Sequence, residues 1–392
     1  MTRIRTALTL LAFALCPLGF TPGLLAQTRP ADERKAQPAS LPPELERDVN
    51  AAIGRGLAFL KAAQDERGGW TAAYGPAVTA IVAQAFVQSP EYGPQHAAVR
   101  RAVAYVLTFV QPDGGIYQPE QNLGNYQTSV ALMMLASLDD PAHKERVAAA
   151  QRFLAKLQYD EPESVDAGNP WYGGSGYKEN KRPDLSNTQM MLEALHQSGL
   201  PASDPTYQKA LKFISRCQMS SETNDQPFAR GGPGDGGFIY SPANGGESKA
   251  ETEVVEGRTR LRSYGSMTYA GFKSMLYANV DRQDTRVRAA LEWIRRHWTL
   301  DSNPNMPGER SHEGLYYYYH VFARAMRAWG QPVITDERDV PHHWRIELCR
   351  KLLSLQNRDG SWVNTKDRWL EGDPNYITAL SVLTLQEAVD KQ

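Results

Sequence analysis

Residues 55–79 read RGLAFLKAAQDERGGWTAAYGPAVT: a helical segment that ends near Gln64, a glycine-rich turn with Trp70, and the start of a second helix with Thr79. The same order recurs along the chain. Gln returns at positions 111, 158, 218 and 356, with Trp298 in the fifth copy, and Thr returns at 128, 188, 268 and 378, with Tyr319 in the fifth. A repeat of roughly 50 to 60 residues cannot bury its own apolar faces and must stack on its neighbours. The repeat therefore determines the architecture.

Two kinds of helix alternate in this pattern. The first kind carries one apolar stripe and is predicted at 51–64, 99–111, 147–158, 207–218, 287–298 and 344–356. The second kind is apolar around its circumference and is predicted at 77–87, 126–138, 186–196, 266–278, 315–329 and 376–388. Because helices without a polar face are buried, the alternation predicts an all-α fold, an (α/α)6 toroid with an outer ring, an inner ring and a cavity along its axis.

The N-terminal segment predicts export. Arg3 and Arg5 precede an apolar stretch from Ala7 to Leu15, which is typical of a signal peptide over residues 1–26 with cleavage near Ala26. An uncleaved anchor is the alternative. Residues 27–45 are rich in proline and mixed charge and are predicted to be a flexible leader, and residues 46–392 are predicted to be one toroid domain. The expected location is therefore periplasmic or extracellular.

The net charge gives no sign of nucleic-acid binding, and the cysteine positions argue against a disulfide. Removing residues 1–26 takes two of the 43 basic side chains and none of the 44 acidic ones, which leaves a net charge near −3 and no indication of nucleic-acid binding. Cys217 and Cys349 fall in non-adjacent repeats, so we expect two buried free thiols rather than a disulfide. No metal ion and no other cofactor is predicted.

The turn between the two helices is greatly extended in two repeats. It takes 30 residues from Gln158 to Thr188 and 50 residues from Gln218 to Thr268. Loops of that length are usually lids, binding elements or disordered segments. Since the inserts are rich in aromatic residues, we expect them to pack over the ring; those aromatic residues are Trp171, Tyr172, Tyr177, Phe228, Phe238 and Tyr240.

The repeat resembles that of the squalene and hopene cyclases and of the β subunits of protein prenyltransferases. The match is close in the first copy, through Arg55-Gly56, Phe59-Leu60, Gln64, Gly68 and Trp70, and partial in the others; it spans about residues 50–388. The resemblance implies a terpenoid cyclase-like toroid in which the Gln and the aromatic residue tie an outer helix to a neighbouring turn. These residues are accordingly expected to be scaffold.

The same resemblance implies that the usual chemistry is missing. Hopene-type cyclases carry an Asp-x-Asp-Asp run before the repeated Thr, and its middle acid protonates an alkene; here Ser186 and Asn187 follow Asp184 instead. A hydroxyl and an amide cannot supply that proton. The prenyltransferase zinc ligands fall on Tyr264, Ser266 and Ile377, which leaves zinc without ligands.

Aromatic and amide groups remain at the starts of the inner helices. The candidate ligand-binding residues are Tyr126, Gln127, Asn187, Tyr264, Tyr317, His320 and Tyr376, and the candidate catalytic residue is Asp184. The alternatives are core tyrosines with hydroxyls bonded to backbone, a core histidine, and an Asp184 that only caps its helix.

These observations favour an exported protein with an elongated apolar, isoprenoid-like ligand in its axial cavity. Two alternatives stay open: a terpene cyclase or transferase that uses Asp184 or the Tyr/His group, and an interaction scaffold that docks a protein on its rim inserts. A sugar-cleaving toroid would need two facing carboxylates, and Glu193 and Glu313 do not form a clear pair with Asp184. The expected partner is an apolar small molecule; the sequence leaves contact with a membrane surface open and names no protein partner.

Overall fold

The structure is a computed structural model that describes residues 40–230 and 234–389. The contacts divide the chain into Met1–Gln37 and Pro38–Gln392, and the second unit is the one described below. The predicted signal peptide and the leader up to residue 39 lie outside the described residues, so both stay predictions.

Helices dominate the described part of the chain. The outer helices are α1 (Pro43–Ala62), α3 (Ala97–Leu107), α5 (Lys144–Lys156), α7 (Pro205–Cys217), α9 (Thr285–Arg296) and α11 (Trp344–Leu355). The inner helices are α2 (Ala77–Val87), α4 (Gly124–Ser137), α6 (Leu185–Gln197), α8 (Gly265–Tyr277), α10 (Leu315–Trp329) and α12 (Pro374–Val389). Short 3-10 helices lie between them: η1 (Ala72–Tyr74), η2 (Pro119–Gln121), η3 (Pro141–His143), η4 (Glu161–Glu163), η5 (Pro227–Ala229), η6 (Ala243–Gly245) and η7 (Gly308–Arg310).

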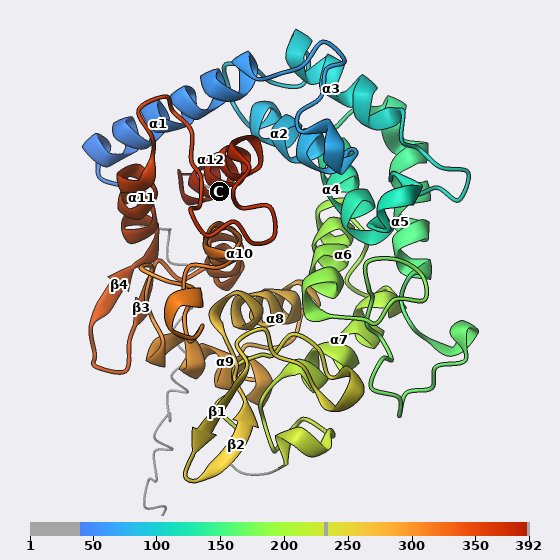
Figure 1. The fold of residues 1–392 in the computed structure, drawn as a ribbon, viewed down its shortest axis with the longest axis vertical. Helices are drawn as coiled ribbons and strands as arrows, with labels where there is room; N and C mark the ends of the chain where they lie inside the picture. Colours follow the sequence, from blue (N-terminus) through green and yellow to red (C-terminus); the bar gives the residue numbers. More distant parts are fainter. Residues whose placement is uncertain (1–39, 231–233, 390–392) are drawn as a thin grey trace, which may run out of the picture. The chain divides into compact units, whose positions relative to one another are not determined.

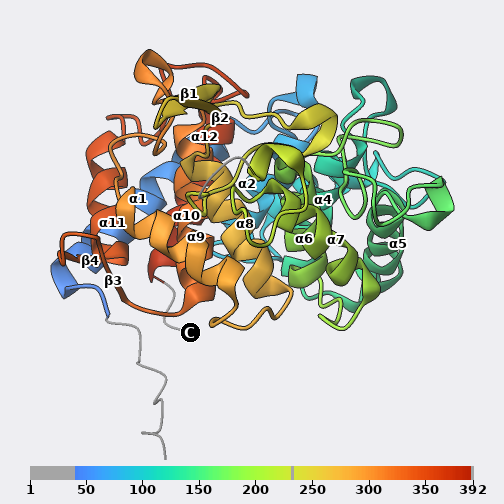
Figure 2. The same cartoon turned by 90° about the horizontal axis from the view of Figure 1, so that it is seen from below.

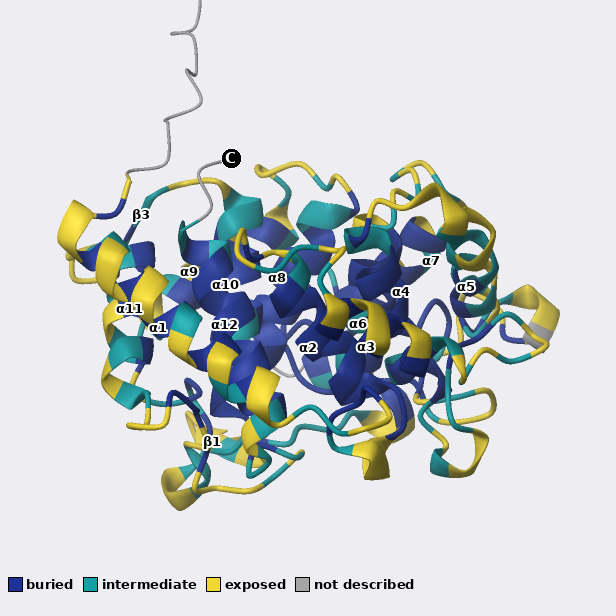
Figure 3. Cartoon of the chain, turned by 90° about the horizontal axis from the view of Figure 1, so that it is seen from above, coloured by how far each residue is buried: buried dark blue, intermediate teal, exposed yellow. Residues whose placement is uncertain are grey.

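The inner helices form a closed circuit. Each contacts the next in the order α2, α4, α6, α8, α10, α12, and α12 contacts α2 in turn (Figure 1). The outer helices lie behind this circuit, and their solvent-facing stripes alternate with buried ones in Figure 3. In α2 every residue from Ala77 to Phe86 is buried, as expected for a helix without a polar face. The predicted all-α toroid is confirmed.

The repeated Gln and Thr hold the rings together. The Gln218 amide donates to the carbonyl of Gly236 in its own turn (2.9 Å) and to the carbonyl of Arg286 on the next outer helix (2.8 Å). Gln64, Gln158 and Gln356 make the same double contact. Each repeated Thr hydroxyl accepts a backbone N–H from the turn, at 3.0–3.1 Å; the donors are Trp70, Ile116, Ser175, Phe238 and Trp362.

The turns also require glycine. In five repeats the first turn glycine has φ between +80° and +91°; these are Gly68, Gly114, Gly173, Gly236 and Gly360. Each lies against the backbone of the following outer helix, and a Cβ on Gly173 would come within 1.8 Å of the Lys209 carbonyl oxygen. Glycine is thus needed both for the left-handed backbone and for the close approach.

The outer helices differ from the sequence prediction at both ends. They stop before the repeated Gln, because residues such as Gln218 (φ −82°, ψ 132°) and Gln356 turn to an extended backbone that lets the side chain reach the glycine turn. The first outer helix begins at Pro43 rather than near residue 51, so it takes in the last three residues of the predicted leader. Pro43 at its start and Glu44 and Glu46 in its first turn favour a helix N-terminus there.

Helix α1 closes the outer ring. Gln356, just after α11, donates to the Ala52 carbonyl (2.9 Å), and Arg55 of α1 donates to the Gln356 side chain. Helix α1 packs against both α11 and α12. The first and last repeats are therefore joined by the same contacts that join consecutive ones.

Two short antiparallel hairpins are the strands of the described residues. One joins β1 (Thr252–Val255) to β2 (Arg258–Leu261), and the other joins β3 (Val333–Thr335) to β4 (Pro341–His343). Glu256 and Gly257 both have positive φ, as a type I′ hairpin turn requires. Figure 2 shows the first hairpin at one end of the ring.

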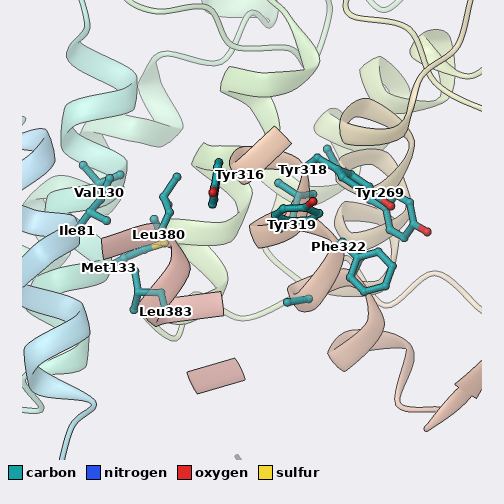
Figure 4. Packing of buried hydrophobic residues seen from close by; sticks show 14 of the residues in the cluster. Ile81, Val130, Met133, Tyr269, Tyr316, Tyr318, Tyr319, Phe322, Leu380 and Leu383 are labelled. Atoms are coloured by element: carbon teal, nitrogen blue, oxygen red, sulfur yellow. The ribbon is translucent and has the colours of Figure 1, made fainter. Parts of the chain in front are cut away.

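The core divides into an aliphatic and an aromatic part. Figure 4 shows Ile81, Val130, Met133, Leu380 and Leu383 on one side, Tyr269, Tyr318, Tyr319 and Phe322 on the other, and Tyr316 between them. Tyr269 meets Tyr318 edge-on at 5.5 Å between ring centroids.

Cys217 and Cys349 are free and buried, as predicted. Across the described ranges, no helix combines the length and apolar character that a membrane span needs.

Candidate functional site

A cavity of about 270 Å³ lies where the inner helices begin. Its wall is mostly aromatic: Tyr74, Leu123, Tyr126, Tyr177, Ser186, Asn187, Tyr240, Lys249, Tyr264, Ser266, Met267, Tyr317, Trp369, Leu370 and Tyr376. The first turns of α4, α6, α8, α10 and α12 all contribute, because the inner helices run parallel and present their N-termini at the same end of the ring. Five of the seven predicted ligand-binding residues line this cavity.

The long inserts complete the wall. Tyr177 comes from the third-repeat insert, and Tyr240 and Lys249 come from the fourth, so these inserts pack over the ring as expected. The Lys249 amine lies 4.4 Å from the centroid of the Tyr240 ring and pairs with Glu247. Tyr74 and Trp369 are more than a third exposed and belong to the turns that precede α2 and α12. The repeat pattern does not predict that Tyr74, Tyr177, Tyr240 and Trp369 line the cavity. The sequence shows only that they are aromatic residues in turns.

The tyrosine hydroxyls bond to one another across the cavity. The Tyr126 and Tyr376 hydroxyl oxygens are 3.2 Å apart, and the Tyr317 hydroxyl is 3.2 Å from the Ser186 hydroxyl. Burial raises the pKa of Tyr126 to about 12 and raises the pKa values of Tyr264 and Tyr376 as well. Since all these phenols stay protonated near neutral pH, the aromatic wall offers neutral hydroxyls and ring faces.

Asp184 caps α6 from behind this wall. Its carboxylate accepts the Asn187 backbone N–H and the Asn187 side-chain amide, each at 2.8 Å, and the Tyr240 hydroxyl. The carboxyl is 2% exposed and does not line the cavity. Burial raises the pKa of Asp184 from 3.8 to about 6, although its hydrogen bonds lower it in part. The group is a weak, fully bonded acid.

Two predicted ligand-binding residues lie outside the cavity. The Gln127 side chain accepts the Gln118 N–H (2.7 Å) and donates to Tyr74 and Gln121, so it fastens the turns of the first two repeats. His320 lies about one turn farther along α10 than Tyr317, and its Nδ1 is 3.2 Å from the Thr384 hydroxyl of α12. Desolvation lowers the pKa of His320 to about 4 and keeps it neutral.

Two residues that the sequence analysis missed cap the inner helices from other repeats. The Asn303 side chain accepts the Ser266 N–H (2.9 Å) at the start of α8, and Glu371 accepts the Tyr317 N–H (2.7 Å) at the start of α10. Burial raises the pKa of Glu371 to about 7. Each cap lies far from its helix in sequence, so local capping rules do not reveal it.

A polar chain runs from the cavity along the ring axis. We call Gln189, Lys273, Glu193, Arg324 and Glu387 the axial chain. Lys273 and Arg324 both pair with Glu193, and Arg324 lies 3.4 Å from Glu387. The side chains of Lys273, Glu193 and Arg324 are at most 3% exposed. Charged residues on otherwise apolar inner helices were the signal for this chain.

The axial chain ends at a second cavity, of about 860 Å³, where the inner helices end. Its wall is mainly polar and includes Gln88, His196, Gln197, Tyr277, Arg324, Arg327, Gln386 and Glu387. His196 stacks on Tyr277 at 4.1 Å between centroids. The two ends of the ring therefore differ in chemistry: aromatic at the helix N-termini and charged at the C-termini.

Within the described ranges, no three His, Cys, Asp or Glu side chains gather as a metal site would need.

Comparisons with known proteins concern the fold. No protein-family model matches the sequence, and no relative was found among curated proteins. Solved structures do match. D-mannose isomerase superposes with a TM-score of 0.56 at 10% identity and covers 89% of this chain and 99% of its own. The type II terpene cyclase MstE from Scytonema gives a TM-score of 0.54 at 14% identity, over 88% of this chain and 99% of its own.

Two further matches extend this set. A family 76 glycoside hydrolase from a bovine Bacteroides thetaiotaomicron strain gives a TM-score of 0.52 at 11% identity, over 87% of this chain and 78% of its own. A variant of MstE in complex with its substrate geranylgeranyl dihydroxybenzoate gives 0.53 at 14% identity, over 89% of this chain and 99% of its own. At these identities the likeness defines the fold. The chain is an α/α toroid, of the architecture that the terpenoid cyclase-like proteins share.

Because its pKa is raised, Asp184 should contribute to the free energy of unfolding in a way that depends on pH. The folded carboxyl, at about 6, binds its proton more tightly than the unfolded one, near 3.9. Its contribution to stability is thus complete below about pH 4 and is lost as the pH rises through about 6. The difference in unfolding free energy between the wild-type protein and Asp184→Asn is expected to shift by about 2–3 kcal/mol between about pH 4 and 7. Urea unfolding at each pH measures it; a difference that stays constant contradicts the raised pKa.

Proposed function

We propose that this protein is exported and binds an elongated, apolar, isoprenoid-like molecule in the cavity at the N-terminal ends of its inner helices, without protonating it. The aromatic wall carries the proposal: tyrosine rings, Met267, Leu123 and Leu370 supply an apolar surface, while the buried carboxyl of Asp184 is bonded to Asn187 and does not line the cavity. Ligand sites are typically concave, mainly apolar, and contain a few fixed polar groups.

The comparisons add support of a general kind. The terpene cyclase MstE, which shares the fold, holds a substrate with a geranylgeranyl chain. The cavity of about 270 Å³ is slightly smaller than the usual range for ligand sites, about 300–1,000 Å³. A ligand with a short isoprenoid chain fits this size, and a longer one would extend through the open mouth beside Tyr74 and Trp369.

Acid catalysis on an alkene is the less favoured function. Protonating a carbon–carbon double bond needs a very strong acid, whereas burial raises the pKa of Asp184 to about 6. The position that the cyclase resemblance assigns to the proton donor is Ser186. With Ser186 in place of the acid, the described residues that line the cavity include no group to protonate an alkene as a cyclase does.

Sugar cleavage is also less favoured. Glu193 is committed to Lys273 and Arg324, and Glu313 pairs with Arg310 and Arg368. A glycosidase needs two carboxyl groups free to flank the scissile bond.

The test is to identify what the native protein carries. Protein purified from its own cells without detergent is extracted with organic solvent, and the extract is analysed by mass spectrometry. We expect a stoichiometric isoprenoid-like lipid that is reduced in a variant with Tyr264→Trp, which fills the cavity. The proposal fails if the cavity is empty and the protein also rejects farnesol, geraniol and farnesene. Incubation with squalene and prenyl diphosphates, beside Asp184→Asn, tests the cyclase alternative, which turnover abolished by the substitution would support.

A further inference from the structure

A line of hydrogen bonds leads from Lys273 to the cavity wall. The Lys273 amine donates to Gln189 Oε1 (2.8 Å), and Gln189 Nε2 donates to the Tyr317 hydroxyl oxygen (3.0 Å). The Tyr317 hydroxyl in turn lies 3.2 Å from the Ser186 hydroxyl. Tyr317 and Ser186 both line the cavity and are partly accessible, whereas Gln189 and Lys273 are fully buried.

The buried Lys273 determines which groups donate and which accept along this line of hydrogen bonds. Burial lowers the pKa of Lys273 to about 7, but the Glu193 carboxylate beside the amine favours its protonated form. A protonated lysine has only donors, so Gln189 turns its oxygen toward Lys273. The Gln189 nitrogen then faces Tyr317, and the Tyr317 oxygen accepts from it. Two protons remain on the hydroxyls of Tyr317 and Ser186, and their mutual hydrogen bond uses one of them. Whichever hydroxyl donates in that bond, one O–H is left to donate into the cavity.

We infer that the ligand places a hydrogen-bond-accepting oxygen, a carbonyl, against the hydroxyls of Ser186 and Tyr317. The inference rests on the proposed function and narrows its ligand class: an apolar chain that ends in an aldehyde or ketone rather than a plain hydrocarbon. The polarised line from Lys273 strengthens the donor, because hydrogen bonds in series reinforce one another. Gln189 and Lys273 act through Tyr317 and are positioning residues.

The Gln189→Glu variant reverses the line with almost no change of shape. A carboxylate at position 189 accepts from Lys273 and from the Tyr317 hydroxyl, so Tyr317 must donate to it. Ser186 then donates to Tyr317, and the pair offers the cavity only lone pairs. The aldehyde farnesal is expected to bind Gln189→Glu about three- to tenfold more weakly than wild type, while the hydrocarbon farnesene stays within about twofold. The alcohol farnesol, which can donate, is expected to gain relative to farnesal.

Titration calorimetry with the full chain and these three probes measures the effect. Gln151→Glu is the matched control, because the Gln151 side chain on α5 bonds to Ser198 at the far end of α6 and does not line the cavity; it is expected to leave all three affinities unchanged. Ser186→Ala keeps the Tyr317 donor and is expected to retain farnesal, whereas Ser186→Ala with Tyr317→Phe removes both hydroxyls and is expected to weaken farnesal as Gln189→Glu does.

The outcomes separate the two proposals. If wild type binds none of the probes, the proposed function fails. If farnesene binds but the ratio of farnesal to farnesene affinity is the same in wild type and in the Ser186→Ala/Tyr317→Phe variant, the apolar site stands and the carbonyl inference is overturned. The double variant keeps the test decisive even if Gln189→Glu does not fold.

Discussion

Replacing Gly173 by alanine is expected to lower the free energy of unfolding by about 3–5 kcal/mol, because two costs combine. The residue has φ +80°, where a side chain is strained, and its Cβ would lie 1.8 Å from the Lys209 carbonyl oxygen. That oxygen belongs to the backbone of α7, which cannot move without breaking the helix from the ring. Urea unfolding followed by circular dichroism measures the loss.

Gly199 offers a matched control for this prediction. It has nearly the same φ, +82°, but a Cβ there would meet no atom within 4 Å. Gly199→Ala should therefore show the backbone strain alone, about 1–2 kcal/mol. Equal losses at the two positions would mean that the close approach of turn and helix contributes nothing to the stability of the ring.

Glu193→Gln is expected to have a comparably large effect, a loss of about 3–5 kcal/mol, since it leaves the buried Lys273 without a carboxylate partner and takes one of two from Arg324. The Lys273 side chain is 0% exposed and the Arg324 side chain 3%, so water cannot replace the lost partner. Thermal and urea unfolding of the variant give the value.

Two further variants test whether unpaired buried charge causes this loss of stability. Glu193→Leu combined with Lys273→Met removes both members of one pair, while Arg324 keeps Glu387, so the double variant should lose less than Glu193→Gln. Asp301→Asn breaks the surface pair with Lys351, where the Asp301 side chain is 86% exposed, and should cost about 0–1 kcal/mol. A double variant less stable than Glu193→Gln would contradict the role assigned to the buried charges.

The ring could be predicted because its determinants are local and repeated. Gln64 and Gln218 bond to the glycine turn of their own repeat, and Thr79 and Thr268 bond to a backbone N–H just after that turn, although the number of residues between the partners differs. Positions counted back from the repeated Thr, or from Tyr319 in the fifth repeat, identified Tyr126, Asn187, Tyr264, Tyr317 and Tyr376, which line the cavity. Gln127 is next to Tyr126 and so lies on another face of α4, whereas His320 lies about one turn farther along α10 than Tyr317, beyond the cavity.

The rest of the site depends on contacts without a repeat. Tyr177 and Tyr240 reach the cavity through long inserts whose paths no periodicity describes, and Glu371 caps a helix that begins 56 residues earlier at Leu315. The axial chain needs four inner helices to bring Gln189, Lys273, Arg324 and Glu387 together. Such groups become neighbours only once the ring has closed.

The contact of α1 with α11 and α12 has a consequence for the order of events during synthesis. Helix α1 is synthesised well before its partners, because Gln356 and α12 supply the contacts of Ala52 and of the inner face of α1. Until α12 has been made, apolar surfaces at both ends of the growing arc stay uncovered, which invites binding by a chaperone. The nascent chain can assemble an arc, but the hollow is enclosed only when α12 joins α1 and α2.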